Sequence, residues 1–306
     1  MKVSVIGAGN VGAMTAMRLV EKDLCDVELI DIAAGLAKGK SEDIMDAASV
    51  IGYDTKISGS EDFSAMKGSF IIINTAGFAR KPGMTREELL SKNTAIVKQV
   101  GENIKKYAPE AIVINVANPL DAMTYVIYKT SSINSKKVIG MAGLLDSSRM
   151  DLAIARVLNK PVKKIDSTVL GTHGETMVPV PSETKVAGKK LSDILSDNQI
   201  KEITEKTKNR GAEIVSYLKT GSAFFGPSAC AAKMAEIILK DKKETITCSC
   251  LLSGEYGIKD IYLGVLAVLG KNGIEKIIEL KLSKQELSGL TSAAAAVKEL
   301  INQCTI

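Results

Sequence analysis

The sequence contains no tryptophan and a single histidine, and only 4% of its residues are aromatic. Proteins that bind single-stranded nucleic acid stack bases on aromatic side chains, so this shortage argues against that class of ligand. No apolar run reaches the roughly 18 residues that a membrane-spanning helix needs. The first residues lack the apolar core and the small-residue cleavage site of a signal peptide, so we expect a cytoplasmic protein.

Cysteine is also scarce, with five residues in 306. An odd number of cysteines in a chain of this size does not indicate a disulfide framework. Cys248 and Cys250 have the wrong spacing for a C-x-x-C motif, and no histidine is near them in the sequence. We therefore predict that both are small core residues and that the protein holds no metal.

The charge is close to balanced, because 40 lysines and arginines face 35 aspartates and glutamates. The lysines are mostly interleaved with acidic residues, which is typical of solvated helix faces. The small basic excess suits a small anionic substrate better than a polyanion. We expect neither a nucleic acid nor a membrane as partner.

Short apolar runs alternate with helical periodicity through the first half of the chain, which predicts a doubly wound parallel sheet with helices on both faces. The second half reads as long helices and short strands, with Thr245–Leu252 and Ile261–Leu269 as a hairpin or meander. We predict an α/β fold with a nucleotide-binding type of domain over residues 1–142 and an α+β domain over residues 143–306. The strands expected in the first domain are Val3–Ile6, Val27–Ile30, Ser69–Asn74, Ala111–Asn115 and Lys137–Gly140.

The stretch GAGNVG, from Gly7 to Gly12, stands between the first predicted strand and the first predicted helix. In this G-x-G-x-x-G pattern, Gly7 allows a tight turn, Gly9 lets the backbone approach a pyrophosphate, and Gly12 lets the helix pack close to the strand. Asp31 ends the next strand, 19 residues after Gly12. A carboxylate there accepts hydrogen bonds from a ribose diol and repels a 2′-phosphate, so the pattern predicts a Rossmann domain that binds NAD. The alternatives are a glycine-rich turn without a ligand and an aspartate that only caps a turn.

A loop with two arginines, GFARKPGMTR from Gly77 to Arg86, lies between a predicted strand and a predicted helix. Its glycines and its proline suit a segment that closes over a site. Arg80 and Arg86 are either plain surface charges or residues that bind an anion. A guanidinium can bind a carboxylate through two parallel hydrogen bonds. Their place in a dinucleotide-binding type of fold favours anion capture.

Four more polar residues stand out. Asn118 follows the strand at residues 111–115, at the sheet edge where ligands bind in open α/β folds. Asp146 and Arg149 lie three residues apart near the start of a helix and therefore share a face, although the pair could be only a local ion pair. The lone histidine, His173, lies between Gly171 and Gly174. Imidazole is the side chain that exchanges protons near neutral pH.

Together these motifs resemble those of the lactate/malate dehydrogenases. The resemblance covers essentially the whole chain and follows the family's order, which is GAGNVG, Asp31, NTAGFARKPGMTR, VANP, LDSSR and GTHGE. It implies a hydride transfer between NAD and a 2-hydroxy or 2-oxo acid. A carboxylate beside the histidine favours the imidazolium, so we also predict a raised pKa for His173.

The resemblance implies a role for each of these residues. His173 would be the general acid–base and Asp146 its orienting partner. Arg149 would hold the C1 carboxylate of the substrate, Arg86 would polarise the reacting carbonyl when the loop closes, and Asn118 would position the substrate oxygen and the nicotinamide. The implied cofactor contacts are Gly7, Ala8, Gly9, Asn10, Val11, Gly12, Asp31, Thr75, Ala76, Gly77, Asn93, Val116 and Asn118.

The choice of substrate depends on Arg80. In the family this position meets the variable end of the substrate, with glutamine usual in lactate enzymes and arginine in malate enzymes. A second carboxylate, as in oxaloacetate, needs a second cation once water is expelled. We therefore expect (S)-malate and oxaloacetate as substrates. The pattern is similar to the lactate-dehydrogenase-like malate branch, which implies a homodimer or homotetramer, and it departs from the family at Glu175, where aspartate is usual.

Two other functions compete with this interpretation. Tyr125 and Lys129 match the Tyr-x-x-x-Lys pair of short-chain dehydrogenases, but that family has a different glycine pattern, and we interpret Tyr125 and Tyr128 as helix packing. A catalytically silent NAD-binding or scaffold protein would not need the intact set of arginines, aspartate and histidine. A dehydrogenase would need all of them.

Overall fold

The computed structural model describes residues 1–78 and 84–305. Six parallel strands build the amino-terminal part of its main sheet, in the order β3-β2-β1-β4-β5-β6. In this order the chain first runs outward from β1 and then returns to β4, and ligands bind at such a switch point, outside the carboxyl ends of the strands. The strands are β1 (Lys2–Ile6), β2 (Asp26–Ile30), β3 (Ile57–Ser60), β4 (Ile71–Asn74), β5 (Ile112–Asn115) and β6 (Val138–Gly140).

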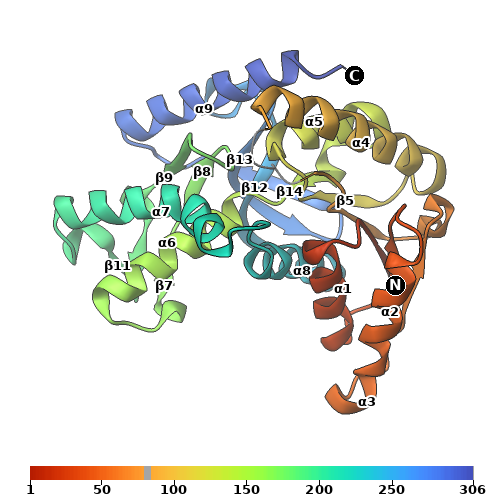
Figure 1. Ribbon diagram of the computed structural model, residues 1–306. Helices are drawn as coiled ribbons and strands as arrows, with labels where there is room; N and C mark the ends of the chain where they lie inside the picture. The colour runs from red at the N-terminus through yellow and green to blue at the C-terminus, as the bar shows by residue number, and fades with distance from the viewer. Residues whose placement is uncertain (79–83, 306) are drawn as a thin grey trace.

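Helices cover both faces of these strands, which is why the strands read as nearly continuous apolar runs. Helices α4 and α5 pack on one face, and α1 packs on the other together with α8 from the second half of the chain (Figure 1). The first-half helices are α1 (Asn10–Glu21), α2 (Leu36–Asp46), α3 (Ala48–Ile51), α4 (Arg86–Tyr107) and α5 (Leu120–Ser131), with 3₁₀ turns at Phe63–Met66 and Ser135–Lys137.

The second half continues the same sheet with antiparallel strands. Ser249 of β12 pairs with Gly140 of β6, and Gly264 of β13 pairs with Gly171 of β8, which gives one sheet of eleven strands. The added strands are β8 (Val169–Gly171), β9 (Met177–Pro179), β12 (Glu244–Ser253), β13 (Lys259–Gly270) and β14 (Gly273–Ile278). A separate small sheet holds β7 (Ile165–Asp166), β10 (Lys185–Val186) and β11 (Lys189–Lys190).

The helices of the second half surround the antiparallel strands. They are α6 (Gly143–Leu158), α7 (Asp197–Leu218), α8 (Phe225–Leu239) and α9 (Lys284–Asn302), with 3₁₀ turns at Val162–Lys164, Pro181–Glu183, Leu191–Asp193 and Glu255–Gly257.

The predicted fold class is confirmed, because a parallel doubly wound part is followed by an α+β part. The predicted hairpin or meander is a meander of β12, β13 and β14. Sequence analysis missed β3, whose residues Ile57–Ser60 include only one large apolar side chain. The boundary between residues 142 and 143 stays a prediction.

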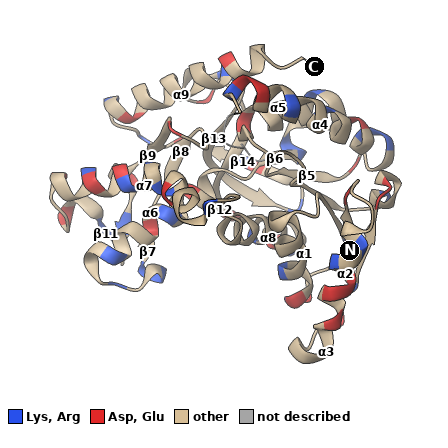
Figure 2. Cartoon of the chain, viewed as in Figure 1, with Lys and Arg blue, Asp and Glu red and all other residues tan. Residues whose placement is uncertain are grey.

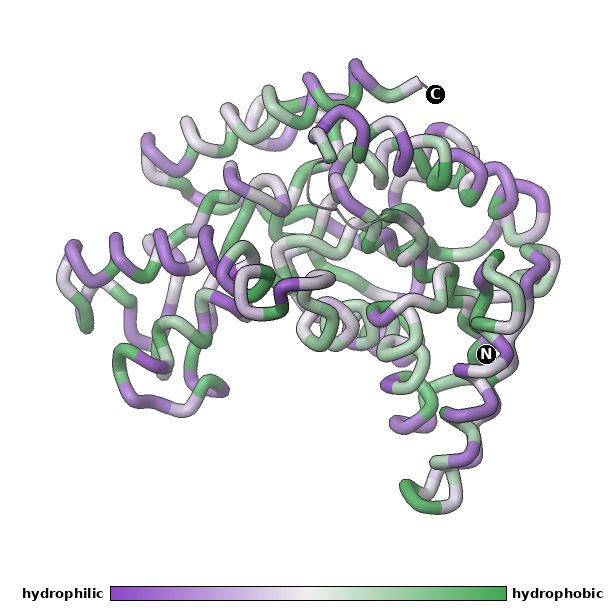
Figure 3. The backbone as a smooth tube through the Cα atoms, viewed as in Figure 1, coloured by the Kyte–Doolittle hydropathy of each residue, from purple (hydrophilic) through white to green (hydrophobic). Residues whose placement is uncertain are grey.

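Hydropathy and charge separate as the layers require. Green, hydrophobic segments concentrate in the central sheet in Figure 3, whereas charged residues lie mainly on the outer helices and the small sheet in Figure 2. Cys248 and Cys250 are buried in β12, which confirms their prediction as core residues. Among the residues that the structure describes, no helix has both the length and the apolar character needed to cross a membrane.

Candidate active site

The turn between β1 and α1 uses its three glycines for different reasons. Gly7 has a φ of +94°, a backbone conformation that favours glycine. A Cβ on Gly12 would lie 1.8 Å from the carbonyl oxygen of Gly7, so no other residue permits this approach of helix to strand. A Cβ on Gly9 would meet nothing within 4 Å, and Gly9 and Asn10 are exposed. The amino terminus of α1 therefore opens on free space, where its N–H groups and dipole suit a phosphate.

Asp31, at the end of β2, reaches back to this glycine turn. Its Oδ2 accepts a hydrogen bond from the N–H of Ala8 at 2.6 Å, and its Oδ1 accepts one from the N–H of Ala33 at 2.9 Å. The turn-capping role considered from the sequence is thus present. Each carboxylate oxygen keeps a further lone pair, so the capping role leaves Asp31 able to accept hydrogen bonds from a ribose.

Two buried asparagines that sequence analysis did not single out support the loops after β4 and β5. The amide of Asn74 donates to Oδ1 of Asn115 at 2.9 Å. The N–H of Ala76 donates to Asn74 Oδ1, and the N–H of Ala117 donates to Asn115 Oδ1, both at 3.2 Å. A polar residue ending each of two apolar strands was the available signal, because a buried amide needs partners. These bonds shape both loops at the carboxyl edge of the sheet.

Asn93 of α4 joins the same two loops. Its Oδ1 accepts a hydrogen bond from the N–H of Phe78 at 2.7 Å, and its Nδ2 donates to the carbonyl oxygens of Phe78 and Asn118 at 3.1 and 2.6 Å. The cis peptide Asn118–Pro119 leads into α5, and the residue Asn118 is exposed. The predicted cofactor residues that lie on these two loops are Thr75, Ala76, Gly77, Val116 and Asn118.

The lone histidine meets the predicted pair from α6. Nδ1 of His173 lies 2.8 Å from Oδ2 of Asp146, and Oδ1 of Asp146 accepts a hydrogen bond from Arg149 at 3.2 Å. The side chain of Asp146 is only 1% exposed, whereas that of His173 is 17% exposed. Because Nδ1 faces Asp146, Nε2 is the ring nitrogen that remains for a substrate.

Opposing effects act on the pKa of His173. Burial of the ring lowers this pKa, and the charge of Arg149 also lowers it. The charge and hydrogen bond of Asp146, helped by the charge of Asp121, raise it by more. The net pKa lies above the ordinary value of 6.5, in the direction that the sequence predicts.

The raised pKa of His173 can be measured without assignment of other imidazoles, because the chain has a single histidine. We expect an NMR titration of the ring to give a higher midpoint in the folded protein than in the urea-unfolded protein. The group then stabilises the fold below its unfolded pKa of about 6.5, and this stabilisation is lost as the pH rises through the folded pKa. An unshifted or lowered midpoint would count against the pairing with Asp146.

Arg86, the first residue of α4, forms an ion pair with Glu175, with Nη2 and Oε1 2.6 Å apart. Thr85 caps the amino terminus of α4 and forms a capping box with Glu88. The helix therefore begins at Arg86. The residue that departs from the family pattern, Glu175, thus contacts the arginine loop. Arg80 lies outside the described residues.

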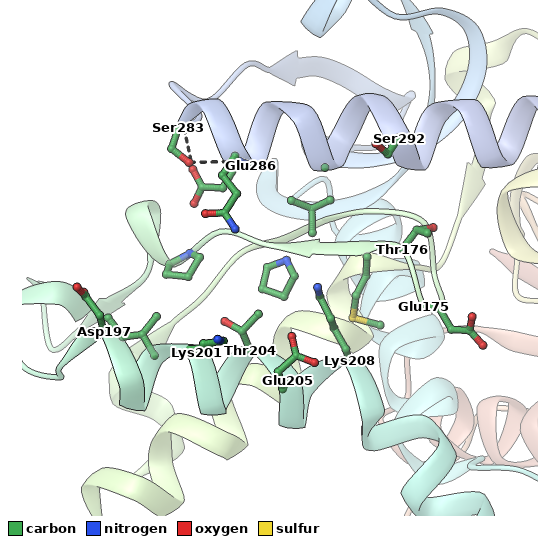
Figure 4. A pocket seen from close by; sticks show the side chains of 17 residues that line it. Glu175, Thr176, Asp197, Lys201, Thr204, Glu205, Lys208, Ser283, Glu286 and Ser292 are labelled. Atoms are coloured by element: carbon green, nitrogen blue, oxygen red, sulfur yellow. Dashed lines mark hydrogen bonds between the residues drawn. The ribbon is translucent and has the colours of Figure 1, made fainter.

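A groove of about 720 Å³ begins at Glu175 and runs between β9, α7 and α9 (Figure 4). Its lining carries both charges, with Lys201 and Lys208 on the same helix as Glu205. His173, Asp146 and Arg149 do not line this groove. The groove therefore adjoins the candidate site at Glu175 but does not include the histidine.

The tyrosines of the competing Tyr-x-x-x-Lys match pack in α5. Tyr125 and Tyr128 are half-buried against the core, with ring centroids 6.4 Å apart. The ammonium of Lys129 lies 5.2 and 5.4 Å from these two ring centroids. Their prediction as packing residues is confirmed.

Comparison with known proteins gives one family over nearly the whole chain. Residues 1–140 match the family model described as the NAD binding domain of lactate/malate dehydrogenase, and residues 144–305 match that of its alpha/beta C-terminal domain. A malate dehydrogenase from Chlorobium limicola is 48% identical over 303 residues, which cover 99% of this chain and 98% of the relative.

Solved structures give the same result for the fold. The malate dehydrogenase of Cryptosporidium parvum superposes with a TM-score of 0.96 at 41% identity, covering 99% of this chain and 98% of that one. A lactate dehydrogenase of the same organism, complexed with lactic acid and b-nicotinamide adenine dinucleotide, has a TM-score of 0.95 at 40% identity, covering 98% and 96%. The backbone alone therefore does not separate the two substrates.

Proposed function

Because this chain belongs to the lactate/malate dehydrogenase family, we propose that it interconverts (S)-malate and oxaloacetate with His173 as the proton donor and acceptor. Relatives named malate dehydrogenase match it at 48% and 47% identity over nearly its full length, so it is an NAD-dependent oxidoreductase of the malate dehydrogenase type. The proton role is carried by one observation, the 2.8 Å contact between His173 Nδ1 and Asp146 Oδ2.

The reduction of oxaloacetate requires a proton for the oxygen and a hydride for the carbon of its ketone. The reduced cofactor, when bound, supplies the hydride. His173 enters as the imidazolium, Asp146 holds its Nδ1–H, and Nε2–H gives its proton to the developing alkoxide. The histidine is left neutral and takes a proton from solvent before the next turnover, and in malate oxidation the same nitrogen accepts the proton. The raised pKa of His173 favours the protonated form that the reduction needs.

The arginines hold the substrate in this proposal. The guanidinium of Arg149 has five N–H donors, and one of them donates to Asp146. Two parallel N–H groups therefore remain to bind the C1 carboxylate of the substrate. Arg86 releases its ion pair with Glu175 and then polarises the ketone carbonyl of the substrate. Since exposed ion pairs contribute only about 0–1 kcal/mol, exchanging that partner for a substrate oxygen costs little.

The glycine turn fits NAD. The open space at Gly9 lies at the amino terminus of α1, where a pyrophosphate would accept backbone N–H bonds. Asp31 stands beside it and would take the ribose hydroxyls. The loops that contain Thr75 and Asn118 would line the nicotinamide end. The oligomeric state and the cytoplasmic location stay predictions, which light scattering and cell fractionation would test.

The substrate assignment is tested by NADH oxidation with oxaloacetate and pyruvate side by side. We expect oxaloacetate to have the higher kcat/KM, and Arg80→Gln to lower that value about 10²-fold, because an unpaired charge in a closed site costs about 3 kcal/mol or more. Arg156→Gln, an exposed arginine in the last turn of α6, is the matched control. Better turnover of pyruvate by the unaltered protein would show that the argument from Arg80 is wrong.

A further inference from the structure

A second carboxylate, which sequence analysis did not assign, lies beside the histidine. Asp121 is in the first turn of α5 and is 4% exposed. Its Oδ1 accepts a hydrogen bond from the hydroxyl of Ser249 at 2.6 Å. Its Oδ2 accepts a long one, 3.4 Å, from the main-chain N–H of His173. One buried side chain thus connects α5, β12 and the loop between β8 and β9.

Glycines bring these three elements together. A Cβ on Gly140 would lie 2.7 Å from the Cβ of Ser249, so only glycine in β6 lets this serine approach α5. A Cβ on Gly264 would lie 2.4 Å from the carbonyl oxygen of Gly171, which lets β8 approach β13 just before the histidine loop. Asp121 therefore occupies a position that the close packing of the sheet creates.

A carboxylate is an expensive choice for a purely structural contact. Both hydrogen-bond donors to Asp121 are neutral, and each donates to a different carboxylate oxygen, so the site buries a full charge to hold two neutral groups. Burial raises the pKa of Asp121 to about 6, with Asp146 also raising it, whereas the Ser249 hydroxyl and the N–H and charge of His173 lower it. At neutral pH the group is thus mainly ionised, and the nearby positive charge that a carboxylate favours is the imidazolium.

We propose that Asp121 is a positioning residue for His173, which holds the main chain of the histidine loop against the start of α5 and stabilises the imidazolium with its charge. Asp121 is two residues from the Asn118–Pro119 peptide, so it couples the proton donor to the segment that would position the substrate oxygen. The charged groups that act on His173 within the described chain are Asp146 and Arg149 of α6 and Asp121 of α5. The inference rests on the proposed proton role of His173.

The test is Asp121→Asn in the whole chain, which keeps the shape of the side chain and one oxygen acceptor but removes the charge and the second acceptor. We expect the NMR midpoint of His173 to fall, and the pH profile of kcat/KM for oxaloacetate reduction to move in the same direction. The kcat should fall about tenfold, as when a residue that orients a catalytic group is removed, with KM for NADH unchanged.

Asp151→Asn is the matched control. Asp151, in α6, is half-buried, has a pKa that burial raises to about 6, and accepts a hydrogen bond from the backbone N–H of Ser167 at 3.1 Å. It does not contact the histidine. We expect this variant to leave the His173 midpoint and the pH profile unchanged.

The unaltered protein provides a test that does not depend on the variant folding. Because Asp121 and His173 interact, the ring signals should show a second, smaller inflection near pH 6 as Asp121 titrates. A missing inflection, or an Asp121→Asn protein with unchanged histidine midpoint and pH profile, overturns the proposal. If His173→Asn keeps its turnover, the proposed function fails instead, whatever Asp121→Asn does.

Discussion

Replacing His173 by asparagine is expected to lower kcat for oxaloacetate reduction about 10³- to 10⁴-fold, near the upper end of what general acid–base catalysis contributes. Asparagine keeps a polar group of similar reach toward Asp146 but has no proton to donate at neutral pH. The affinity for NADH should remain, because the glycine turn and Asp31 lie on other elements of the sheet. Single-turnover kinetics and a fluorescence titration with NADH measure the two quantities separately.

Thr172→Ala is the control for this variant, because Thr172 lies in the same loop and contacts Thr176 at 2.7 Å. We expect it to change kcat little. Retained turnover in His173→Asn would contradict the dehydrogenase mechanism. Lost turnover with intact NADH binding would exclude a silent NAD-binding or scaffold protein. The pH dependence that comes from the imidazole should also disappear, since no other histidine can replace it.

Replacing Arg149 by glutamine is expected to lower kcat/KM for oxaloacetate about 10³-fold, because loss of a buried charge partner costs about 3–5 kcal/mol. Most of the loss should appear as a higher KM. The pKa of His173 should rise further, since the charge of Arg149 lowers it. Steady-state kinetics and the histidine NMR titration test the two effects in one variant.

Arg149→Lys separates charge from shape. Lysine keeps the positive charge, so the His173 midpoint should stay close to that of the unaltered protein. It lacks the planar fork, so binding of the carboxylate should remain weak. An unchanged KM in Arg149→Gln would contradict the carboxylate role, and Arg156→Gln on the same helix should leave both quantities unchanged.

Much of the candidate site could be predicted because its signals are local. The glycine pattern from Gly7 to Gly12 predicts a tight turn and a close approach of the helix to the strand. Both are present in the structure. The pair Asp146 and Arg149 is three residues apart on one helix, so its contact follows from helical geometry. The asparagines that shape the loops, Asn74 and Asn115, were missed because one polar residue at a strand end is a weak signal.

Asp121 and Glu175 show where local signals end. In the sequence, Asp121 looks like an ordinary acidic residue in the first turn of a helix, where its negative charge interacts favourably with the helix dipole. Nothing near it in the sequence indicates that Ser249 and His173 lie against it. Glu175 is visible as a departure from the family pattern, but its contact with Arg86 bridges 89 residues.

The sequence by itself determined the alternation of strands and helices, the conformations that glycine permits, and which side chains can carry charge or a proton. Only the tertiary structure decided which of them meet. His173 lies 27 residues from Asp146 and 52 from Asp121, and Ser249 lies 128 from Asp121. These contacts depend on strands from distant parts of the chain pairing with one another, Ser249 of β12 with Gly140 of β6 and Gly264 of β13 with Gly171 of β8. Local periodicity reports which face of an element is buried, but it holds no information about the register between distant strands.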